Sequence, residues 1–380
     1  MNIVKRWLTL LLVLTWIGGG YHVGTIPSAQ AATQPLATEL DLSRKGQQVD
    51  QLFASFIGKD EPGGAVIVIQ KGKVLYKAAY GLANLKSKTP LTPQHLFHIG
   101  SVGKQFTALA VMMLAEAGKL KYDLPIRTYL PELPAWGEQV TIRHLLYHTS
   151  GLPDYTDAML DPMLERSDTP DNEDLLAALA HIRLRSAPGA VFEYSNPGYD
   201  LLGLLVARVS GQKFPDFMQQ RIFAPLGMTR TFSLPRRDHL RLPLLAHSYT
   251  MDDNDKLVAY DSDPLDNLVG SGSIYSTVEE MALYDHALYS NIFVKPATLA
   301  EAFRSAVTND GKKTDYGFGW EIERWQGKPY VAHSGAWLAF LSDYVRFLNQ
   351  ELSVIVLFNR DYNVPDEPRI GVQVAQIYLK

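Results

Sequence analysis

A serine and a lysine lie three residues apart at the start of a long apolar segment, in the stretch "HIGSVGKQFTALAVMML". The segment runs from Ser101 to a stop at Gly118 and is apolar on every side of a helix, so it is expected to be buried. The spacing places the Ser101 hydroxyl and the Lys104 amine on one helical face. Burial disfavours the ammonium form, which makes Lys104 a candidate base for Ser101, and the helix N-terminus adds a positive field for an oxyanion. A capping serine beside a lysine that reaches solvent is the alternative interpretation.

Two further short motifs have residue types that suit such a site. In "FEYSNPGYDLLG", Tyr194 and Asn196 lie in a Pro-Gly loop that opens a helix, and alternate residues of an extended loop can present both side chains to one cavity. The tripeptide His333-Ser334-Gly335 lies at the end of a predicted strand, where a sheet edge can line a cleft. Gly335 is expected to allow close backbone approach by a substrate.

Both of the first two motifs also have a second copy. A Ser-x-x-Lys spacing should occur about once or twice by chance in a chain of this length, and Ser210 and Lys213 form the other one. They follow the apolar run "DLLGLLVARV" and include Gly211, which is typical of a helix C-terminus with the lysine in solvent. Tyr289 and Asn291 likewise trail a helical run and are interpreted as a helix end.

The order of the motifs resembles the active-site motifs of the serine β-lactamase and penicillin-binding-protein superfamily, in its class C and D-alanyl-D-alanine carboxypeptidase branch. The matching residues are Ser101-x-x-Lys104, Tyr194-x-Asn196 and His333-x-Gly335. Other segments resemble family segments in the expected order, so the similarity covers nearly all of the chain after its first 31 residues: "GGAVIVIQKGKVLYKAAYGLAN", "TIRHLLYHTSGLPDY", "IFAPLGMTRTFS" and "GSGSIYSTVEEMALY".

The resemblance implies a role for each motif residue. Ser101 would be the nucleophile that becomes acylated, Lys104 would help to deprotonate it, and Tyr194 would be the shared acid and base. Asn196 would hydrogen-bond the substrate amide or help to hold Lys104. The oxyanion hole would use the backbone N–H groups of Ser101 and Ala336. The resemblance implies neither a metal nor a cofactor.

The third motif departs from the β-lactamase pattern. Those enzymes typically carry Lys-Thr-Gly, whose cation and hydroxyl receive the substrate carboxylate, whereas this chain has His333 and Ser334 as the substrate-binding pair. A histidine has a reference pKa of ~6.5 and is expected to be only partly cationic at neutral pH, which weakens such a clamp. We therefore expect weak or no β-lactam hydrolysis, and an activity like that of a carboxypeptidase, D-aminopeptidase, amidase or esterase.

The leading functional prediction is an exported serine hydrolase that acts on peptide, amide or ester bonds, with peptidoglycan stem peptides among its candidate substrates. The alternative is a penicillin-binding or sensor module that acylates without efficient turnover. An α/β-hydrolase is disfavoured because the chain contains no Gly-x-Ser-x-Gly. The pairs His95-x-x-His98 and His144-x-x-x-His148 have ligand-like spacings, but no third-ligand pattern accompanies them, so we predict no metal site.

The surrounding sequence predicts an α+β fold, an antiparallel sheet with N- and C-terminal helices packed on it and a large, mainly helical insertion. The apolar spacing in residues 40–57 predicts a helix, and Lys71-Gly72 separates two β-branched runs in a hairpin pattern. Strands return after about residue 315, and a closing helix follows. We expect a sheet domain from residues 32–100 and 301–380, a helical domain from residues 101–300, and the active site in the cleft between them.

Composition and the first residues limit the partners and location. The 380-residue chain has a formal net charge of −4, no cysteine and no basic stripe, so we expect no nucleic-acid partner, no disulfide and no thiolate chemistry. Lys5 and Arg6 precede an apolar stretch, and "SAQAA" fits a signal-peptidase site, so residues 1–31 are predicted to be a cleaved signal peptide. The protein would then be periplasmic or secreted. An uncleaved anchor over about residues 7–26 is the alternative, and only that form would contact a membrane.

Overall fold

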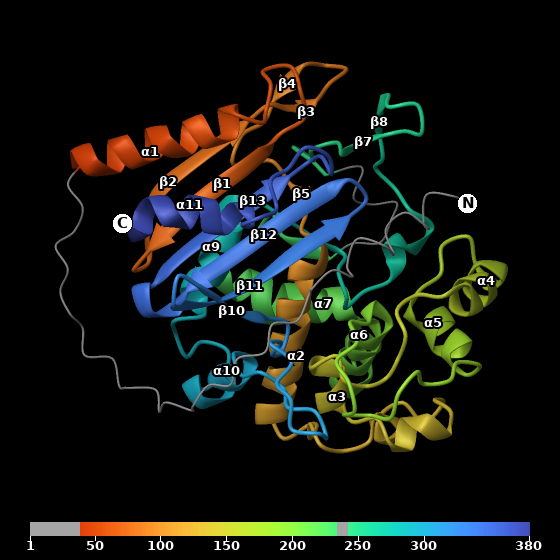
Figure 1. Cartoon of the computed structure of the whole chain (residues 1–380). Helices are drawn as coiled ribbons and strands as arrows, with labels where there is room; N and C mark the ends of the chain where they lie inside the picture. The colour runs from red at the N-terminus through yellow and green to blue at the C-terminus, as the bar shows by residue number, and fades with distance from the viewer. Residues whose placement is uncertain (1–38, 234–241) are drawn as a thin grey trace. The chain divides into compact units, whose positions relative to one another are not determined.

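A six-stranded antiparallel sheet, with strand order β10-β11-β12-β13-β1-β2, lies at the centre of the fold (Figure 1). The structure is a computed structural model and describes residues 39–233 and 242–380. Strand β13 is buried along its whole length because both faces of the sheet are covered, whereas the edge strand β2 is partly exposed. The strands are β1 (Gly64–Gln70), β2 (Lys73–Tyr80), β10 (Glu321–Trp325), β11 (Lys328–Trp337), β12 (Phe340–Phe347) and β13 (Leu352–Phe358).

The hairpin that joins β1 to β2 forms at the predicted turn. Lys71 and Gly72 both have positive φ angles, of 50° and 71°, as a two-residue turn with the right twist requires. On its other side β1 pairs with β13, with Gly64 opposite Phe358. The first strand of the described chain is therefore completed by the last strand.

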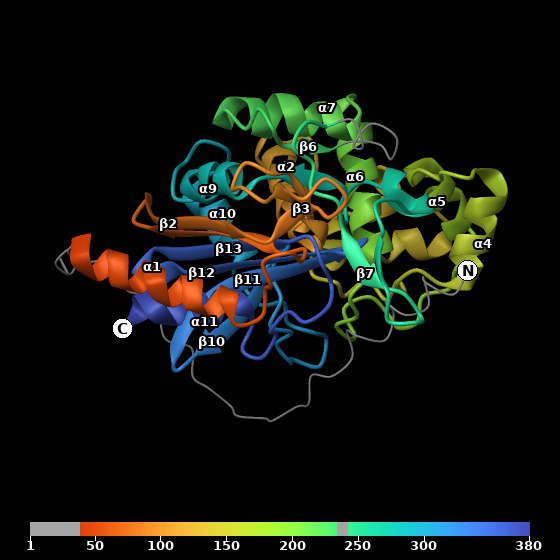
Figure 2. The ribbon, with the colours of Figure 1, turned by 90° about the horizontal axis from the view of Figure 1, so that it is seen from above.

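Helices from the two ends of the described chain cover one face of the sheet. Helix α1 (Glu39–Ala54) and helix α11 (Ile370–Leu379) contact each other and the sheet, and Figure 2 shows both on the side opposite α2 and α9. Val49 and Phe53, one turn apart on α1, are fully buried in this layer. The predicted terminal helices are confirmed, and with them the α+β fold class.

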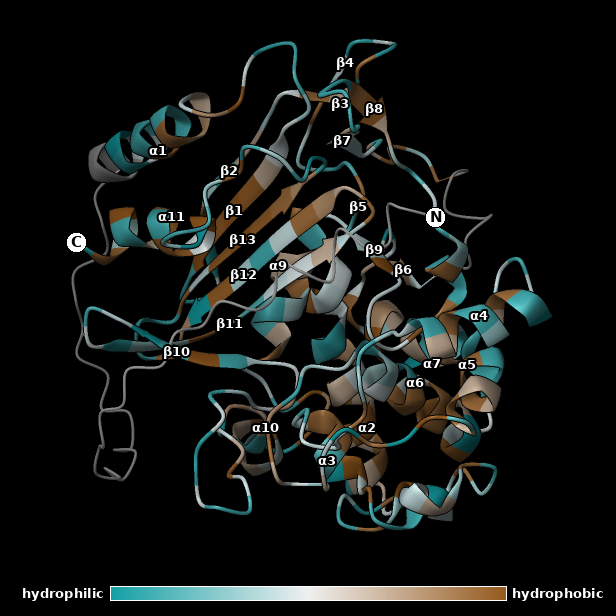
Figure 3. Ribbon diagram, turned by 45° about the vertical axis from the view of Figure 1, so that its right-hand side comes forward, coloured by the Kyte–Doolittle hydropathy of each residue, from teal (hydrophilic) through white to brown (hydrophobic). Residues whose placement is uncertain are grey.

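The other face is covered by helices from the middle of the chain. Helix α2 is buried at its centre, and Figure 3 shows it as largely hydrophobic, like strand β13. The helices of this part are α2 (Lys104–Glu116), α3 (Ile142–Leu146), α4 (Asp157–Arg166), α5 (Asn172–Leu179), α6 (Asn196–Ser210), α7 (Phe214–Met218), α9 (Val278–Ala287) and α10 (Pro296–Ala302). Short strands accompany them: β3 (Leu82–Asn84), β4 (Thr89–Pro90), β5 (Phe97–His98), β6 (Phe232–Ser233), β7 (Tyr249–Met251), β8 (Leu257–Ala259) and β9 (Ile274–Ser276).

A buried ion pair ties α9 to the sheet. Asp285 on α9 accepts hydrogen bonds from Arg346 Nε on β12 at 2.8 Å, from Tyr344 Oη at 2.6 Å and from Ser353 Oγ on β13 at 2.6 Å. Arg346 and Asp285 are almost completely buried. A carboxylate with three donors at this depth fixes the helix over the middle of the sheet.

Residues 39–380 form one compact unit, and the division at residues 100 and 300 remains a prediction. Within the part of the chain that the structure describes, no helix has the length and apolar character needed to cross a bilayer. The predicted signal peptide and the alternative anchor lie outside the described residues.

Candidate active site

Ser101 lies in a short 3-10 turn, Gly100–Gly103, between strand β5 and helix α2. The sequence suggested that Ser101 belongs to the helix itself, but α2 begins only at Lys104. In a 3-10 turn, as in an α-helix, side chains three residues apart lie on the same side. The Ser101 hydroxyl and the Lys104 amine are therefore close together, as predicted, although Ser101 precedes the helix. Gly100 has a φ of +52°, which bends the chain from the strand into the turn.

The turn packs directly on strand β11 at the third motif. A methyl group placed on Gly335 would lie 2.3 Å from the carbonyl oxygen of Ile99 and 3.0 Å from the backbone nitrogen of Ser101. A methyl group on Gly100 would lie 2.6 Å from the nitrogen of Ala336. The backbone N–H groups of Ser101 and Ala336, predicted to form the oxyanion hole, therefore lie on two segments that are in direct contact. Gly335 is needed for the approach of the chain's own backbone, whereas the sequence suggested the approach of a substrate.

Lys104 extends its amine to three oxygen acceptors. Its Nζ donates to Ser101 Oγ at 3.0 Å, to Asn196 Oδ1 at 2.7 Å and to the carbonyl oxygen of Ser271 at 2.8 Å. The side chain is fully buried. Burial lowers the pKa of Lys104 to about 7, although the nearby carboxylates of Asp200 and Asp154 act in the opposite direction. Near neutral pH, a large fraction of this amine can therefore accept a proton from Ser101.

Tyr194 lies over the lysine amine, with its ring centroid 4.8 Å from Lys104 Nζ. Burial raises the pKa of Tyr194 well above its ordinary value, while a hydrogen bond with Ser101 acts the other way, so the phenol keeps its proton. The ring of His148 packs against Tyr194 at 4.2 Å between centroids, and His148 Nδ1 accepts a hydrogen bond from the Ser195 N–H at 3.1 Å. His148 therefore orients the tyrosine and its loop.

Asn196 begins helix α6, where Ser195 is the capping residue and accepts from Gly198 N–H at 3.2 Å. The side-chain oxygen of Asn196 accepts from Lys104, and its Nδ2 donates to Asp154 at 3.3 Å. Of the two roles that the resemblance left open, the structure has Asn196 holding Lys104.

His333 is buried on β11 and is neutral. Its Nδ1 contacts the carbonyl oxygen of Ser334, so Nδ1 carries the proton and Nε2 accepts from Tyr316 Oη at 2.8 Å. Burial lowers the pKa of His333 to about 3, and the charge of Lys104 acts in the same direction. The expectation of a partly cationic histidine is therefore wrong, because that expectation assumed a solvated ring. The side chains of Ser334 and Ala336 are exposed and alternate with the buried His333 and Gly335.

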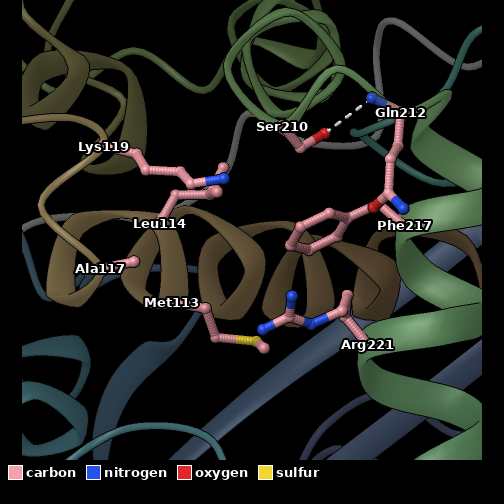
Figure 4. Close-up of a pocket in the computed structure, with 8 residues that line it drawn as sticks. All are labelled: Met113, Leu114, Ala117, Lys119, Ser210, Gln212, Phe217 and Arg221. Atoms are coloured by element: carbon pink, nitrogen blue, oxygen red, sulfur yellow. Dashed lines mark hydrogen bonds between the residues drawn. The ribbon is translucent and has the colours of Figure 1, made fainter.

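The second Ser-x-x-Lys copy lies apart from these residues. Ser210 is the last residue of α6, Gly211 follows with a φ of +72°, and Ser210 Oγ accepts from the Gln212 N–H at 3.2 Å. Figure 4 shows Ser210 at a hollow whose other lining side chains include Lys119 and Arg221, and Lys213 is not among them. The interpretation of this copy as a helix end is confirmed.

The histidine pairs with ligand-like spacing hold loops. The Nδ1 atoms of His95, His98, His144 and His148 each accept a backbone N–H, at 2.9, 3.0, 3.2 and 3.1 Å respectively. Among residues 39–233 and 242–380, no group of three or more potential ligand side chains is arranged around a common metal position.

Sequence reasoning missed several residues around the site, among them Tyr316 and Asp154. Tyr316 fixes His333 and packs edge-on against Tyr194 with centroids 6.3 Å apart. Asp154 accepts from the backbone N–H of Asn196 at 3.0 Å. Tyr316 is the first residue of the predicted strand segment "YGFGWEIERW", but nothing in that pattern pairs it with His333. For Asp154 the only available signal was its position inside the stretch "TIRHLLYHTSGLPDY".

Comparison with known proteins identifies the family. The sequence model of the beta-lactamase family matches residues 49–379. The chain belongs to the beta-lactamase family. Among curated members, it is 32% identical to penicillin-binding protein 4* of Bacillus subtilis over 342 residues, which cover 86% of this chain and 74% of that protein. It is 28% identical to a D-aminopeptidase of Cereibacter sphaeroides, with 85% of this chain and 61% of that longer protein covered.

Solved structures of the beta-lactamase family share the fold. An octameric penicillin-binding protein homologue from Pyrococcus abyssi superimposes with a TM-score of 0.75 and 27% identity, covering 90% of this chain and 78% of that one. A D-amino acid amidase from Ochrobactrum anthropi gives a TM-score of 0.68 and 26% identity, covering 84% and 91% of the two chains. The predicted superfamily is confirmed, and the chain is a serine hydrolase of the beta-lactamase fold.

Proposed function

We propose that the chain hydrolyses amide or ester bonds through an acyl-enzyme on Ser101. The observation that carries this proposal is the buried Lys104 amine, 3.0 Å from Ser101 Oγ, whose pKa is lowered to about 7. As Ser101 Oγ bonds to the substrate carbonyl carbon, its proton passes to Lys104. Tyr194, which is protonated, supplies a proton to the leaving group. Water then attacks the acyl carbon and gives a proton to the Tyr194 oxygen, the ester bond to Ser101 breaks, and Ser101 Oγ recovers its proton from Lys104.

The residues of the third motif favour substrates that have no carboxylate next to the scissile bond. His333 is neutral, and both of its ring nitrogens are occupied within the protein. The positive charge of Arg369 helps to lower the pKa of His333. Arg369 itself is paired with the carboxylates of Glu321, Glu323 and Asp343. These groups offer little fixed positive charge to a substrate anion. D-amino-acid amides, peptides with an N-terminal D-residue and small esters therefore fit better than β-lactams or peptides with a free C-terminus.

The relatives support the same substrate class. A D-aminopeptidase and a D-amino acid amidase are among the similar proteins. We also propose export and a periplasmic or secreted location, since residues 1–31 have the charge and apolar pattern of a signal peptide. In that location, fragments of peptidoglycan that have an N-terminal D-residue are candidate substrates.

Intact-protein mass spectrometry tests the proposal. The protein is incubated with benzylpenicillin, with D-alanine amide or with p-nitrophenyl acetate, and both the adduct and the released product are measured. We expect several turnovers of the amide and the ester and little penicilloyl adduct. Ser101→Ala should abolish both, whereas the matched variant Ser210→Ala should behave as the wild type.

Two other outcomes of this experiment would contradict the proposal. A stable penicilloyl adduct on Ser101, with no more than one equivalent of any product released, would favour the penicillin-binding or sensor module. Activity lost in Ser210→Ala and kept in Ser101→Ala would overturn the site assignment.

A further inference from the structure

Two hydrogen-bond chains that begin at carboxylates outside the three motifs reach the amine of Lys104. The first runs through Asn196, whose Oδ1 accepts from Lys104 at 2.7 Å. Behind it, Asp154 accepts from the Asn196 backbone N–H at 3.0 Å and from Asn196 Nδ2 at 3.3 Å. Because Asp154 is an acceptor only, it holds the NH₂ group of the amide on its own side and leaves Oδ1 facing the lysine.

The second chain runs through Ser271. The carbonyl oxygen of Ser271 accepts from Lys104 at 2.8 Å, and the N–H of the same residue donates to Asp200 Oδ1 at 2.9 Å. The other oxygen of Asp200 accepts from Tyr155 Oη. Tyr155 directly follows Asp154 in the chain, so one dipeptide in the loop before α4 supports both hydrogen-bond chains.

Asp154 and Asp200 are the carboxylates that act on the amine. Burial raises the pKa of both carboxyls, that of Asp200 to about 6, while their hydrogen bonds and the charge of Lys104 act in the opposite direction. Asp154 comes from the loop before α4 and Asp200 from α6, and both attract the ammonium form of Lys104. The other titratable neighbours are kept uncharged by burial, which lowers the pKa values of His148 and His333 and raises that of Tyr194. Burial also raises the pKa of Tyr199, whose ring centroid lies 5.6 Å from Lys104 Nζ.

We propose that Asp154, acting through Asn196, and Asp200, acting through Ser271, are positioning residues that aim the Lys104 amine at Ser101 and set the pH at which it becomes a base. This inference rests on the role of Lys104 in the proposed function. Removing either negative charge favours the neutral amine, so Lys104 would lose its proton at a lower pH. The same change weakens the hydrogen-bond chain that orients the amine.

The rate at which a fluorophosphonate labels Ser101, followed by intact mass across a pH series, tests both effects. For Asp154→Asn we expect the half-maximal rate at a pH lower by about half a unit or more, and a plateau rate at least about tenfold lower. Asp200→Asn should move the half-maximal pH in the same direction. The matched control is Asp161→Asn, the same change at an exposed position of α4, which should reproduce the wild-type curve.

A lower plateau with an unchanged half-maximal pH in both variants would overturn the proposal, because a merely structural role predicts that result. If Asp154→Asn fails to fold, Asp200→Asn decides the question alone. Labelling needs only an activated nucleophile, so a wild type that labels without turning over amides or esters would contradict the proposed function and leave the pH comparison intact. A wild type that is unlabelled at every pH would overturn both.

Discussion

The contact between Gly335 and the nucleophile turn gives the sharpest test of how the site is held. In Gly335→Ala the new methyl carbon would lie 2.3 Å from the carbonyl oxygen of Ile99 and 2.3 Å from Ser342 Oγ, whereas ordinary contacts begin at 3.4 Å. Ser342 Oγ donates to Ile99 O at 2.7 Å, so the hydroxyl cannot turn away without losing that bond. The turn that carries Ser101 must therefore retreat from β11 by about 1 Å.

A retreat of that size affects stability and reactivity by different amounts. Overpacking of this kind costs about 1–3 kcal/mol of the free energy of unfolding. A misplacement of about 1 Å between reacting groups costs about 10²-fold in rate, and here it also moves the Ser101 amide in the predicted oxyanion hole. We expect urea denaturation to show the modest loss, and fluorophosphonate labelling of Ser101 to show the large one.

Gly327, which directly precedes the same strand, provides the control. It lies in the turn between β10 and β11 with a φ of +78°, and a methyl group there would meet no atom within 4 Å. Gly327→Ala should therefore lose about 1–2 kcal/mol through backbone strain and label at nearly the wild-type rate. If Gly335→Ala also labels at the wild-type rate, the argument that β11 positions Ser101 is wrong.

Three further outcomes are expected. The rate of Ser101 labelling in the wild type should rise with pH through about 7, because Lys104 accepts a proton only after losing its own; a flat profile across that range would argue against this base. Tyr194→Phe should lower ester turnover by ~10²-fold or more, and unchanged turnover would assign the proton transfer to another group. Asp285→Asn should lower the free energy of unfolding by ~3 kcal/mol or more, since Arg346 would remain buried without a counter-ion, with labelling kept. Urea denaturation measures that loss, and an unchanged midpoint would contradict it.

Local patterns in the sequence were sufficient for the main elements of the fold. The apolar spacing around Val49 and Phe53 predicted helix α1, and Lys71-Gly72 predicted the β1–β2 turn, because each pattern is dictated by a period or a backbone angle. The same reasoning separated Ser210 from Ser101, since a glycine after an apolar helix marks its end.

The features of the site that could not be predicted depend on contacts between segments that are separate in the sequence. The neutral state of His333 depends on burial and on the charge of Lys104. The partner of its Nε2 is Tyr316, which lies 17 residues away in the chain. Asp154 reaches Asn196 across 42 residues. The period of a strand or helix relates residues within one element, and each of these contacts joins residues of different segments, so no spacing rule connects them. A glycine is required at position 335 because the turn that carries Ser101 packs directly against strand β11. The sequence shows the glycine but not this contact.

The order of strands in the sheet also governs when this protein can complete its folding. The Gly63 N–H donates to Asn359 Oδ1 at 2.7 Å, across 296 positions of the chain, at the end of the pairing between β1 and β13. During synthesis the hairpin of β1 and β2 therefore emerges before β13, and the backbone N–H and C=O groups on one side of the apolar strand β1 stay unpaired. Pairing between strands so distant in the chain is slow, and an unpaired edge strand favours aggregation. Strand β11, which supports the nucleophile turn, is also made late. Reactivity of Ser101 would thus report on a finished sheet, and a chaperone that shields β1 would raise the yield of active protein.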